Sequence, residues 1–396
     1  MSSRTRILFL IPSLVPHGAE RQLCELVRTM DPERFELHVA VFYGAEDVGG
    51  VDLSPELSGL PHVTLHDLRK RRGALGYLQA LPRLLALARR VDPVLLHGYM
   101  DGNLPMLLIG RLLGKPVVWG IRRTSRDLRG LGWTSRALMS LHAALSRFVD
   151  LVIFNSQAGL RNHEAMGLRG RRAVVIPNGF DVARFAPDSA KGALQRAAWG
   201  LPAEGAPVIG IVGRISPVKD HPTFLRAAQR IAAVRSDARF VCVGGGASHD
   251  LEPLKELAAS LGLTERILWA GASGEMASVY NALSVLVLSS RDEGFPNVLG
   301  EAMACGVPCV STEVGDAALL VGEAGMAVAV ADDAALAGGV LTLLQESEAA
   351  REGRSRAARE RICGEFSVAT LARRTEAALM DLMRGEGAPF RAPGDR

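Results

Sequence analysis

The sequence alternates short apolar runs with longer amphipathic stretches, and this pattern constrains its fold more than any other feature. Apolar runs such as Ile7–Ile11 and Leu37–Phe42 alternate with segments of helical periodicity such as Glu20–Met30 and Gly76–Arg90. Strands that are apolar on both faces and alternate with helices are typical of parallel sheets with helices on both sides. The sequence therefore predicts an α/β protein.

The alternation occurs in two sets, which the turn-rich segment Ile176–Pro187 separates. The first set predicts strands at Ile7–Ile11, Leu37–Phe42, Val63–His66, Val94–His97, Val117–Gly120, Leu151–Asn155 and Val174–Ile176. The second predicts strands at Val208–Val212, Phe240–Val243, Ile267–Ala270, Val285–Ser289, Val307–Ser311 and Met326–Val330. The region 335–385 is rich in Ala, Leu, Glu and Arg, which predicts helices.

A chain of 396 residues is more easily accommodated in two cores than in one. We predict two doubly wound, Rossmann-like domains that face each other across a cleft, residues 1–180 and residues 181–370. A last helix at about 370–388 is expected to pack back on the first domain, and residues 387–396 to form a flexible tail. Ligands of such sheets bind beyond the carboxyl ends of the strands, so the functional residues should follow strands.

Composition narrows the class of protein. Hydrophobic residues make up 48% and charged residues 22%, which is ample for buried cores, and a net charge of +4 gives no reason to expect a nucleic acid partner. The first apolar run is too short for a signal peptide, and no window approaches the roughly 20 apolar residues of a membrane span. Five scattered cysteines are typical of a reducing compartment, so we expect a cytoplasmic protein.

No cofactor or metal is expected. Cys305 and Cys309 are spaced like a pair of metal ligands, but no further Cys or His cluster completes a set of four. Ordinary packing is the simpler interpretation of this pair.

The most informative stretch is Ser289–Pro308, where a strand, a loop and a helix follow one another. Gly294 lets the backbone turn tightly, and Pro296 is suited to the first turn of a helix, whose amides attract a phosphate. Glu293 and Glu301, with seven residues between them, would face a sugar and a ribose diol. The alternative is two surface glutamates near a helix cap. The donor-site candidates in this stretch are Glu293, Gly294, Phe295, Asn297, Val298, Leu299 and Glu301.

Three further loops follow predicted strands. Gly213, Arg214 and Lys219 follow the first strand of the second set, where a guanidinium and an ammonium would grip a diphosphate, unless both are simply solvated. Gly244 follows the next strand and allows close approach of a nucleoside, although a plain turn fits equally well. Gly18 opens the first helix and is a further donor-site candidate, since its backbone amides would meet the same phosphates from across the cleft. The pattern is neither a dinucleotide fingerprint nor a Walker loop.

Taken together and in order, these motifs resemble glycosyltransferase family 4, the retaining group with the GT-B fold, over nearly the whole chain. The resemblance rests on Gly18-Ala-Glu-Arg, Ile176-Pro-Asn-Gly-Phe-Asp, Gly213-Arg-x4-Lys219 and Glu293-x7-Glu301. It implies a hexosyltransferase that takes a sugar from a nucleoside diphosphate, most commonly uridine diphosphate, to a glycan or lipid-linked acceptor.

The resemblance also implies a role for each residue. Arg214 and Lys219 would hold the diphosphate without a metal, Glu293 would contact the donor sugar, and Glu301 the ribose. No Asp-x-Asp motif appears in the predicted cleft loops. Positive groups aimed at the leaving diphosphate would stabilise the transition state more than the ground state. Retention of configuration is implied by the family alone.

The sequence departs from the family at one point. Many members carry a histidine after the strand that corresponds to Val117–Gly120, whereas this chain has Arg122 and Arg123 there. A similar Gly-Ile-Arg variant occurs in relatives tied to O-antigen and polysaccharide assembly, which favours a cell-envelope role such as lipopolysaccharide synthesis. Arg122 is therefore a catalytic candidate, and His97, Arg122 and Arg123 are acceptor-side candidates.

Membrane contact is a further expectation. The run Arg69-Lys-Arg-Arg72 precedes a leucine-rich helical segment, and such a basic amphipathic helix would rest on anionic lipid at the inner membrane. The alternative is a helix packed on the sheet with a solvated basic end.

Two rival functions remain open. One is a nucleotide-sugar 2-epimerase of the same fold, which would need no acceptor. The other is a catalytically degenerate donor-binding subunit, a reading whose only support is Arg122 in place of the expected histidine.

Overall fold

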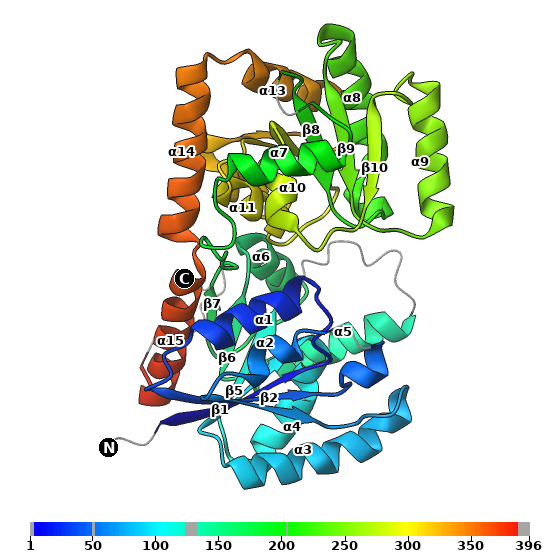
Figure 1. Cartoon of the computed structure of the whole chain (residues 1–396). Coiled ribbons are helices and arrows are strands. Elements are labelled where there is room, and N and C mark those ends of the chain that lie inside the picture. The colour runs from blue at the N-terminus through cyan, green and yellow to red at the C-terminus, as the bar shows by residue number, and fades with distance from the viewer. Residues whose placement is uncertain (1–3, 50–51, 123–132, 203–204, 387–396) are drawn as a thin grey trace. The chain divides into compact units, whose positions relative to one another are not determined.

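The computed structural model describes residues 4–49, 52–122, 133–202 and 205–386. Contacts divide the chain into two compact units (Figure 1). The first comprises residues 1–179 and 368–396, and the second comprises Phe180–Ser367. Each unit is built on its own parallel sheet, of seven strands in the first and six in the second.

The sheet of the first unit has the order β3-β2-β1-β4-β5-β6-β7, and all of its pairings are parallel. The register of the central pair places Thr5 opposite Phe35 and Ile11 opposite Val41. The strands are β1 (Thr5–Ile11), β2 (Phe35–Val41), β3 (Val63–Asp67), β4 (Leu95–Tyr99), β5 (Val117–Ile121), β6 (Leu151–Phe154) and β7 (Ala173–Val175).

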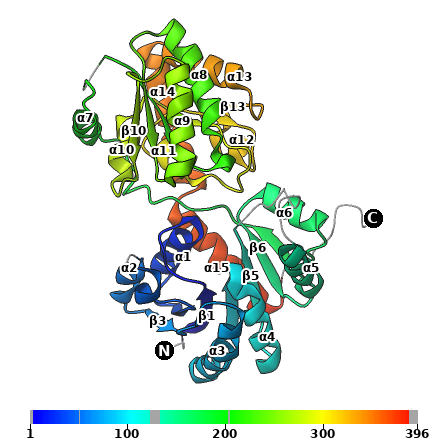
Figure 2. The same cartoon turned by 90° about the vertical axis from the view of Figure 1, so that its right-hand side faces the viewer.

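Helices cover both faces of this sheet (Figures 1 and 2). One face carries α1 (Gly18–Thr29), α2 (Ser54–Ser58) and α15 (Val368–Arg384). The other face carries α3 (Tyr77–Val91), α4 (Asn103–Leu113), α5 (Trp133–Ser146) and α6 (Gln157–Ala165). The 3₁₀ turns of this unit are η1 (Ala45–Val48), η2 (Ala74–Gly76) and η3 (Met100–Gly102).

The last helix belongs to the first unit. Leu371 and Leu379 of α15 are buried in the same core as α1, and the Glu376 carboxylate accepts a hydrogen bond of 2.9 Å from the backbone amide of Asp31. Arg172 donates to the carbonyl oxygen of Gly385 at 2.9 Å. The first unit is therefore completed by residues from the far end of the chain.

The second unit has the same architecture, with the strand order β10-β9-β8-β11-β12-β13. Its strands are β8 (Val208–Val212), β9 (Arg239–Val243), β10 (Ile267–Gly271), β11 (Val285–Leu288), β12 (Cys309–Thr312) and β13 (Met326–Val328). One face carries α8 (His221–Val234), α9 (Ser248–Ser260) and α13 (Asp333–Gln345). The other carries α10 (Met276–Ala282), α11 (Asn297–Ala304), α12 (Ala317–Val321) and α14 (Glu348–Glu365). The remaining elements are α7 (Ser189–Ala198), η4 (Pro217–Lys219) and η5 (Gly322–Ala324).

The prediction of two doubly wound α/β domains is confirmed, and each predicted strand overlaps an observed one. Strand ends differ from the prediction by at most two residues, and β12 begins at Cys309 rather than Val307. Pro308 has no amide hydrogen and cannot donate to the ladder, although its carbonyl accepts from Leu286. The tail predicted at 387–396 lies outside the described residues. In the part of the chain that the structure describes, no helix combines the length and apolarity that a membrane span requires.

In both sheets, the first strand of the unit is the point at which the strand order changes direction, with the next strands of the chain on one side and the later strands on the other. In the first unit the reversal lies between β1 and β4, and in the second between β8 and β11. Loops that follow these strands flank a crevice, which is where doubly wound folds bind ligands. The site residues of each unit are therefore expected in these loops.

Candidate active site

In the second unit, the loops after β8 and β11 bring two charged residues together. The Lys219 ammonium lies 2.5 Å from the Glu293 carboxylate, and both side chains are largely buried. Ser290 donates to the same carboxylate oxygen at 2.8 Å. The cluster Lys219–Glu293–Ser290 thus presents an ordered cation and carboxylate at the point where the strand order reverses.

The two loops are fastened to each other behind this cluster. The Ser289 hydroxyl donates to the carbonyl oxygens of Lys219 and Asp220, at 2.9 and 3.1 Å. Arg291 adds a side-chain bond of 2.9 Å to the buried Asp220 carboxylate. These contacts hold the backbone that carries Lys219 and Glu293, so neither residue depends on its partner alone for its position.

Gly213 and Gly244, which follow β8 and β9, lie against each other. Gly244 has φ of +147°, and a Cβ atom placed there would lie 2.0 Å from the Gly213 carbonyl oxygen. Only glycine fits this contact, which keeps the rim of the sheet open. Arg214 lies on the same rim, is exposed, and has no hydrogen bond or ion pair with any residue that the structure describes.

The loop before α11 brings backbone rather than side chains towards a ligand. Phe295 and Leu299 are buried, and Phe295 stacks on Phe180 with ring centroids 6.3 Å apart. Their contribution to a donor would therefore come from their amides. The helix begins at Asn297, one residue after Pro296, and the first amides of a helix lack intrahelical acceptors. Val298 is half-buried and packs on the same core.

A neighbouring glycine shapes this loop. Gly315 has φ of +54°, and a Cβ atom there would lie 2.2 Å from the carbonyl oxygen of Glu293 and 2.4 Å from that of Gly294. The next residue, Asp316, donates its amide to the Gly294 carbonyl at 3.0 Å. The conformation of the loop that carries Glu293 thus depends on a glycine more than 20 residues further along the chain.

Glu301 is oriented by a buried phenol. The Tyr280 hydroxyl donates to its carboxylate at 2.6 Å. Burial, together with the negative charge of Glu301, raises the pKa of Tyr280 well above its ordinary value, so the phenol keeps its proton and remains a donor. Glu301 is half-buried and held in one orientation, as a carboxylate that binds a diol would need to be.

The cysteines beside this helix have the properties of core residues. Burial, with a smaller effect from Glu301, raises the pKa of the Cys305 thiol to about 12. Cys309 is also fully buried. Both side chains pack in the hydrophobic core of the second unit. Among the described residues, no three His, Cys, Asp or Glu side chains are grouped to hold a metal ion.

In the first unit, Arg122 directly follows β5. Its guanidinium donates to Asn178 Oδ1 at 3.0 Å and to the Tyr99 hydroxyl at 3.4 Å, and it lies 5.4 Å from the centre of the Tyr99 ring. Its Nε atom is buried without a hydrogen bond in the described part of the chain. Arg122 is therefore held in place, with one donor left over. Arg123 lies outside the described residues.

His97 lies inside β4 rather than after its end, because the strand continues to Tyr99. The side chain is wholly buried, between the rings of Phe9 at 5.2 Å and Tyr99 at 4.6 Å. Burial, and to a lesser extent the charge of Arg122, holds its pKa well below the ordinary value. His97 therefore lies in the core, and no contact in the described residues bears on the acceptor. That it contacts the acceptor stays a prediction.

Gly18 is exposed at the start of α1, after the loop that follows β1. One turn further, Gln22 exchanges two hydrogen bonds of 2.8 Å with the backbone of Gly179. This pair ties the helix to the segment that carries Asn178, the partner of Arg122. These hydrogen bonds therefore fix α1 relative to the segment that positions Arg122.

Sequence reasoning missed three residues of this site. Ser290 precedes Glu293 by three residues, a separation from which a side-chain bond could have been expected. Asn178 belongs to the motif Ile176-Pro-Asn-Gly-Phe-Asp, but the motif alone indicates no role for its side chain. Tyr280 has no local signal, since it lies 21 residues before Glu301 and meets it only through the packing of α10 on α11.

Comparison with known proteins matches family models to both units. Residues 16–184 match the model "Glycosyltransferase Family 4", and residues 206–346 match "Glycosyl transferases group 1". The chain belongs to the family 4 and group 1 glycosyltransferases. The matched ranges contain the loops after β5, β8, β9 and β11, whereas β1 and the last two helices, α14 and α15, lie outside them.

Individual relatives agree with this family. A D-inositol 3-phosphate glycosyltransferase from Acidothermus cellulolyticus is 35% identical over 189 residues, 45% of this chain and 42% of that protein. The chain thus matches less than half the length of this relative. The putative glycosyltransferase EpsF of Bacillus subtilis is 25% identical over 79% of this chain and 80% of its own. In fold, the chain is similar to HepE of Anabaena in complex with UDP, with a TM-score of 0.80 and 22% identity over 95% of this chain and all of that one.

Proposed function

We propose that this glycosyltransferase moves a hexosyl group from a UDP-sugar to a glycan or lipid-linked acceptor in cell-envelope polysaccharide assembly, with retention of configuration. The observation that carries the proposal is the cluster Lys219–Glu293–Ser290 at the reversal point of the second sheet. The structures of HepE with UDP and with UDP-glucose support uridine as the nucleoside.

The reaction needs positive charge beside the leaving group. As the bond between the sugar and the diphosphate breaks, negative charge grows on the diphosphate and positive charge on the sugar. Lys219 and Arg214 would bind the diphosphate, helped by the first amides of α11. Because these donors are positioned in advance, they would stabilise the developing charge without reorganising.

The carboxylates would hold the two ends of the donor. Glu293 would accept hydrogen bonds from the sugar hydroxyls, and its negative charge suits a sugar that becomes oxocarbenium-like. Glu301, oriented by Tyr280, would accept from the ribose hydroxyls. We propose that the diphosphate is neutralised by protein cations, so that no metal is required.

On the acceptor side, Arg122 takes the position at which many relatives carry histidine. A guanidinium keeps its proton at physiological pH, so Arg122 would stabilise charge rather than act as a base. With retention, the acceptor would attack on the face from which the diphosphate leaves, and that diphosphate would take up the proton of the acceptor hydroxyl.

The test is a thermal-shift screen of the whole chain with UDP-, GDP- and ADP-sugars in the presence of EDTA. A ligand at 100 times its dissociation constant stabilises a protein by about 2.7 kcal/mol, which is readily measured. We expect a shift with uridine donors in EDTA, lost in the double variant Glu293→Ala, Arg214→Ala and kept in Arg235→Ala, which breaks a surface ion pair with Asp237.

Other outcomes point to the rival functions. No shift with any donor would contradict the proposal. A shift with a donor, but no transfer of its sugar to an acceptor, would favour the degenerate donor-binding subunit. Turnover of the donor to an isomer without an acceptor would identify an epimerase. A shift only with a divalent ion would overturn the metal-free account of the diphosphate.

A further inference from the structure

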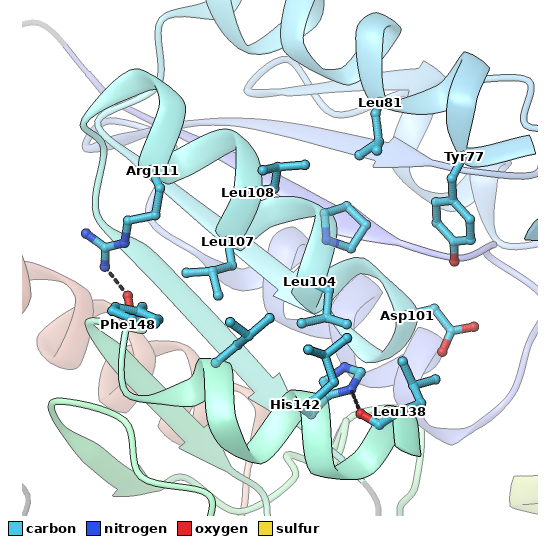
Figure 3. A pocket seen from close by; sticks show the side chains of 13 residues that line it. Tyr77, Leu81, Asp101, Leu104, Leu107, Leu108, Arg111, Leu138, His142 and Phe148 are labelled. Carbon is cyan, nitrogen blue, oxygen red and sulfur yellow. Dashed lines mark hydrogen bonds between the residues drawn. The ribbon is translucent and has the colours of Figure 1, made fainter. Parts of the chain in front are cut away.

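The first unit has an apolar pocket between α3, α4 and α5, away from the loops described above (Figure 3). Its volume is about 620 Å³, within the range of about 300–1,000 Å³ typical of small-molecule sites. Leucines form most of its wall. The lining residues are Leu81, Leu104, Leu107, Leu108, Leu138, Leu141 and Leu145, with Tyr77, Asp101, Pro105, Arg111, His142 and Phe148.

Two of the four polar side chains in the wall, Arg111 and His142, already have protein partners. Arg111 donates to the carbonyl oxygen of Phe148 and, at 2.9 Å, to the Asp150 carboxylate. The Nδ1 atom of His142 lies 2.9 Å from the Leu138 carbonyl oxygen. Tyr77 and Asp101 lie together at the end of the pocket opposite Arg111 (Figure 3). A sugar or nucleotide in the leucine-lined middle would lose its hydrogen bonds to water without replacement, whereas a hydrocarbon would not.

Leucines are also exposed around the mouth of the pocket. The exposed fraction is 46–48% for the lining residues Leu108, Leu138 and Leu141. Leu75 in η2 and Leu78 in the first turn of α3 do not line the pocket, but 79% and 71% of their surfaces are exposed. A gathering of large apolar side chains at one surface marks an interaction site.

The charge of this region identifies the kind of surface that it fits. Residues 68–149 contain fifteen Lys or Arg and three Asp, a net charge of +12, whereas the rest of the chain carries −8. Between residues 68 and 91 there are seven Lys or Arg and no acidic residue. Arg71 and Arg72 of this run are exposed. Exposed leucines beside concentrated positive charge complement an anionic lipid surface.

We propose that the pocket between α3, α4 and α5 holds a hydrocarbon chain of an anionic membrane lipid, and that this lipid is the anchor of the acceptor. The second part rests on the proposed function, since it identifies the acceptor class of the transferase. The first part, binding of the chain, is independent of catalysis. Two copies of this chain would repel each other through the same positive surface, which argues against a second copy as the occupant.

Binding of the chain can be tested with cis-parinaric acid, a single-chain probe whose fluorescence rises in apolar surroundings. We expect the full chain to bind it saturably, and the double variant Leu108→Asp, Leu141→Asp to bind at least tenfold more weakly. Leu194→Asp is the matched control, because Leu194 is 71% exposed on α7 of the second unit. Equal binding by all three proteins, or no binding, would overturn the pocket assignment.

The charge requirement is tested by sedimentation with phosphatidylcholine vesicles, with and without phosphatidylglycerol. Arg71→Ser, Arg72→Ser should weaken binding to the anionic vesicles by roughly 30-fold, since each basic residue near such a surface contributes about fivefold. Lys70 is left intact because it is buried and donates to the Tyr43 hydroxyl at 2.8 Å. Unchanged binding, or preference for neutral vesicles, would contradict an anionic lipid.

Two readouts separate this proposal from the proposed function. The thermal shift with UDP should be the same in the leucine variant as in the parent chain. A variant that keeps this shift but no longer binds the probe has an intact donor site and has lost only the lipid site. If gel filtration shows a dimer that Leu108→Asp dissociates, the occupant is a second copy and the lipid proposal fails.

Discussion

The two units share one architecture but differ at the carboxyl edge of their sheets. In the second unit, the charged groups at this edge are largely paired: Lys219 with Glu293, Asp220 with Arg291, and Glu301 with Tyr280. In the first unit, Arg122 keeps a buried Nε without a hydrogen bond, and neither ring nitrogen of His97 has a partner within the described residues. The second unit thus carries a largely paired network, in which Arg214 and the buried Nδ1 atom of His221 lack a partner among the described residues. In the first unit, the groups without a partner include those of Arg122 and His97.

Under the proposed function, this difference would correspond to two kinds of ligand, the donor in the second unit and the acceptor in the first. A nucleoside diphosphate offers the same charges whichever sugar it carries, and a network fixed in advance suits it. Acceptors vary, and a held arginine with a spare donor can serve different ones. If this is correct, the activity should depend on the paired charges in the second unit and on the unpaired groups in the first.

The largest effect is expected from breaking the Lys219–Glu293 pair. Glu293→Gln keeps the size of the side chain and its bond with Ser290 but removes the charge, so the donor sugar loses a carboxylate and Lys219 loses its partner. We expect the rate of transfer to fall by about 10²–10³. Steady-state kinetics measures this, with Arg235→Ala as control. A fall below tenfold would mean that the pair is structural rather than part of the reaction.

A smaller loss is expected at Arg122. Arg122→Met keeps much of the side-chain length but loses the charge and the bonds to Asn178 and Tyr99. We expect kcat to fall by about 10–100-fold, with the thermal shift by UDP unchanged and partial recovery in Arg122→Lys. If the shift by UDP disappears as well, Arg122 belongs to the donor side and the division between the units is wrong.

The smallest effect concerns stability and pH. The pKa of His97 is held well below its ordinary value in the folded chain, so below about pH 6.5 the unfolded chain takes up a proton that the folded chain does not. Stability should therefore be constant above this pH and fall below it, by about 2 kcal/mol between pH 6.5 and pH 5.

His97→Phe should remove this loss, because the new ring fits among Phe9 and Tyr99 and does not titrate. Urea unfolding at neutral and acidic pH measures the difference. His221 of the second unit, whose pKa burial lowers to about 4, keeps its own pH dependence and serves as an internal comparison. An equal loss in the variant and the parent would show that His97 is protonated in the folded chain.

The sequence predicted the strands well because their residues are apolar on both faces, and this pattern is local. It also located Glu293, Lys219 and Arg122, since each follows a strand in a recognisable loop. It could not predict contacts made by packing, such as Tyr280 on Glu301 or the fit of Gly315 under Glu293. His97 shows the limit most clearly: the strand ends two residues later than predicted, so the side chain lies in the core rather than at the edge of the sheet.

The return of α15 to the first unit has a consequence for how the protein is made. During synthesis, residues 1–179 are made before the second unit. Leu371 and Leu379, which complete the core against α1, are made after it. The second unit, Phe180–Ser367, is continuous and can close while synthesis continues. The half of the molecule that emerges first is therefore the half that finishes folding last, and until then it exposes an apolar face that chaperones would recognise.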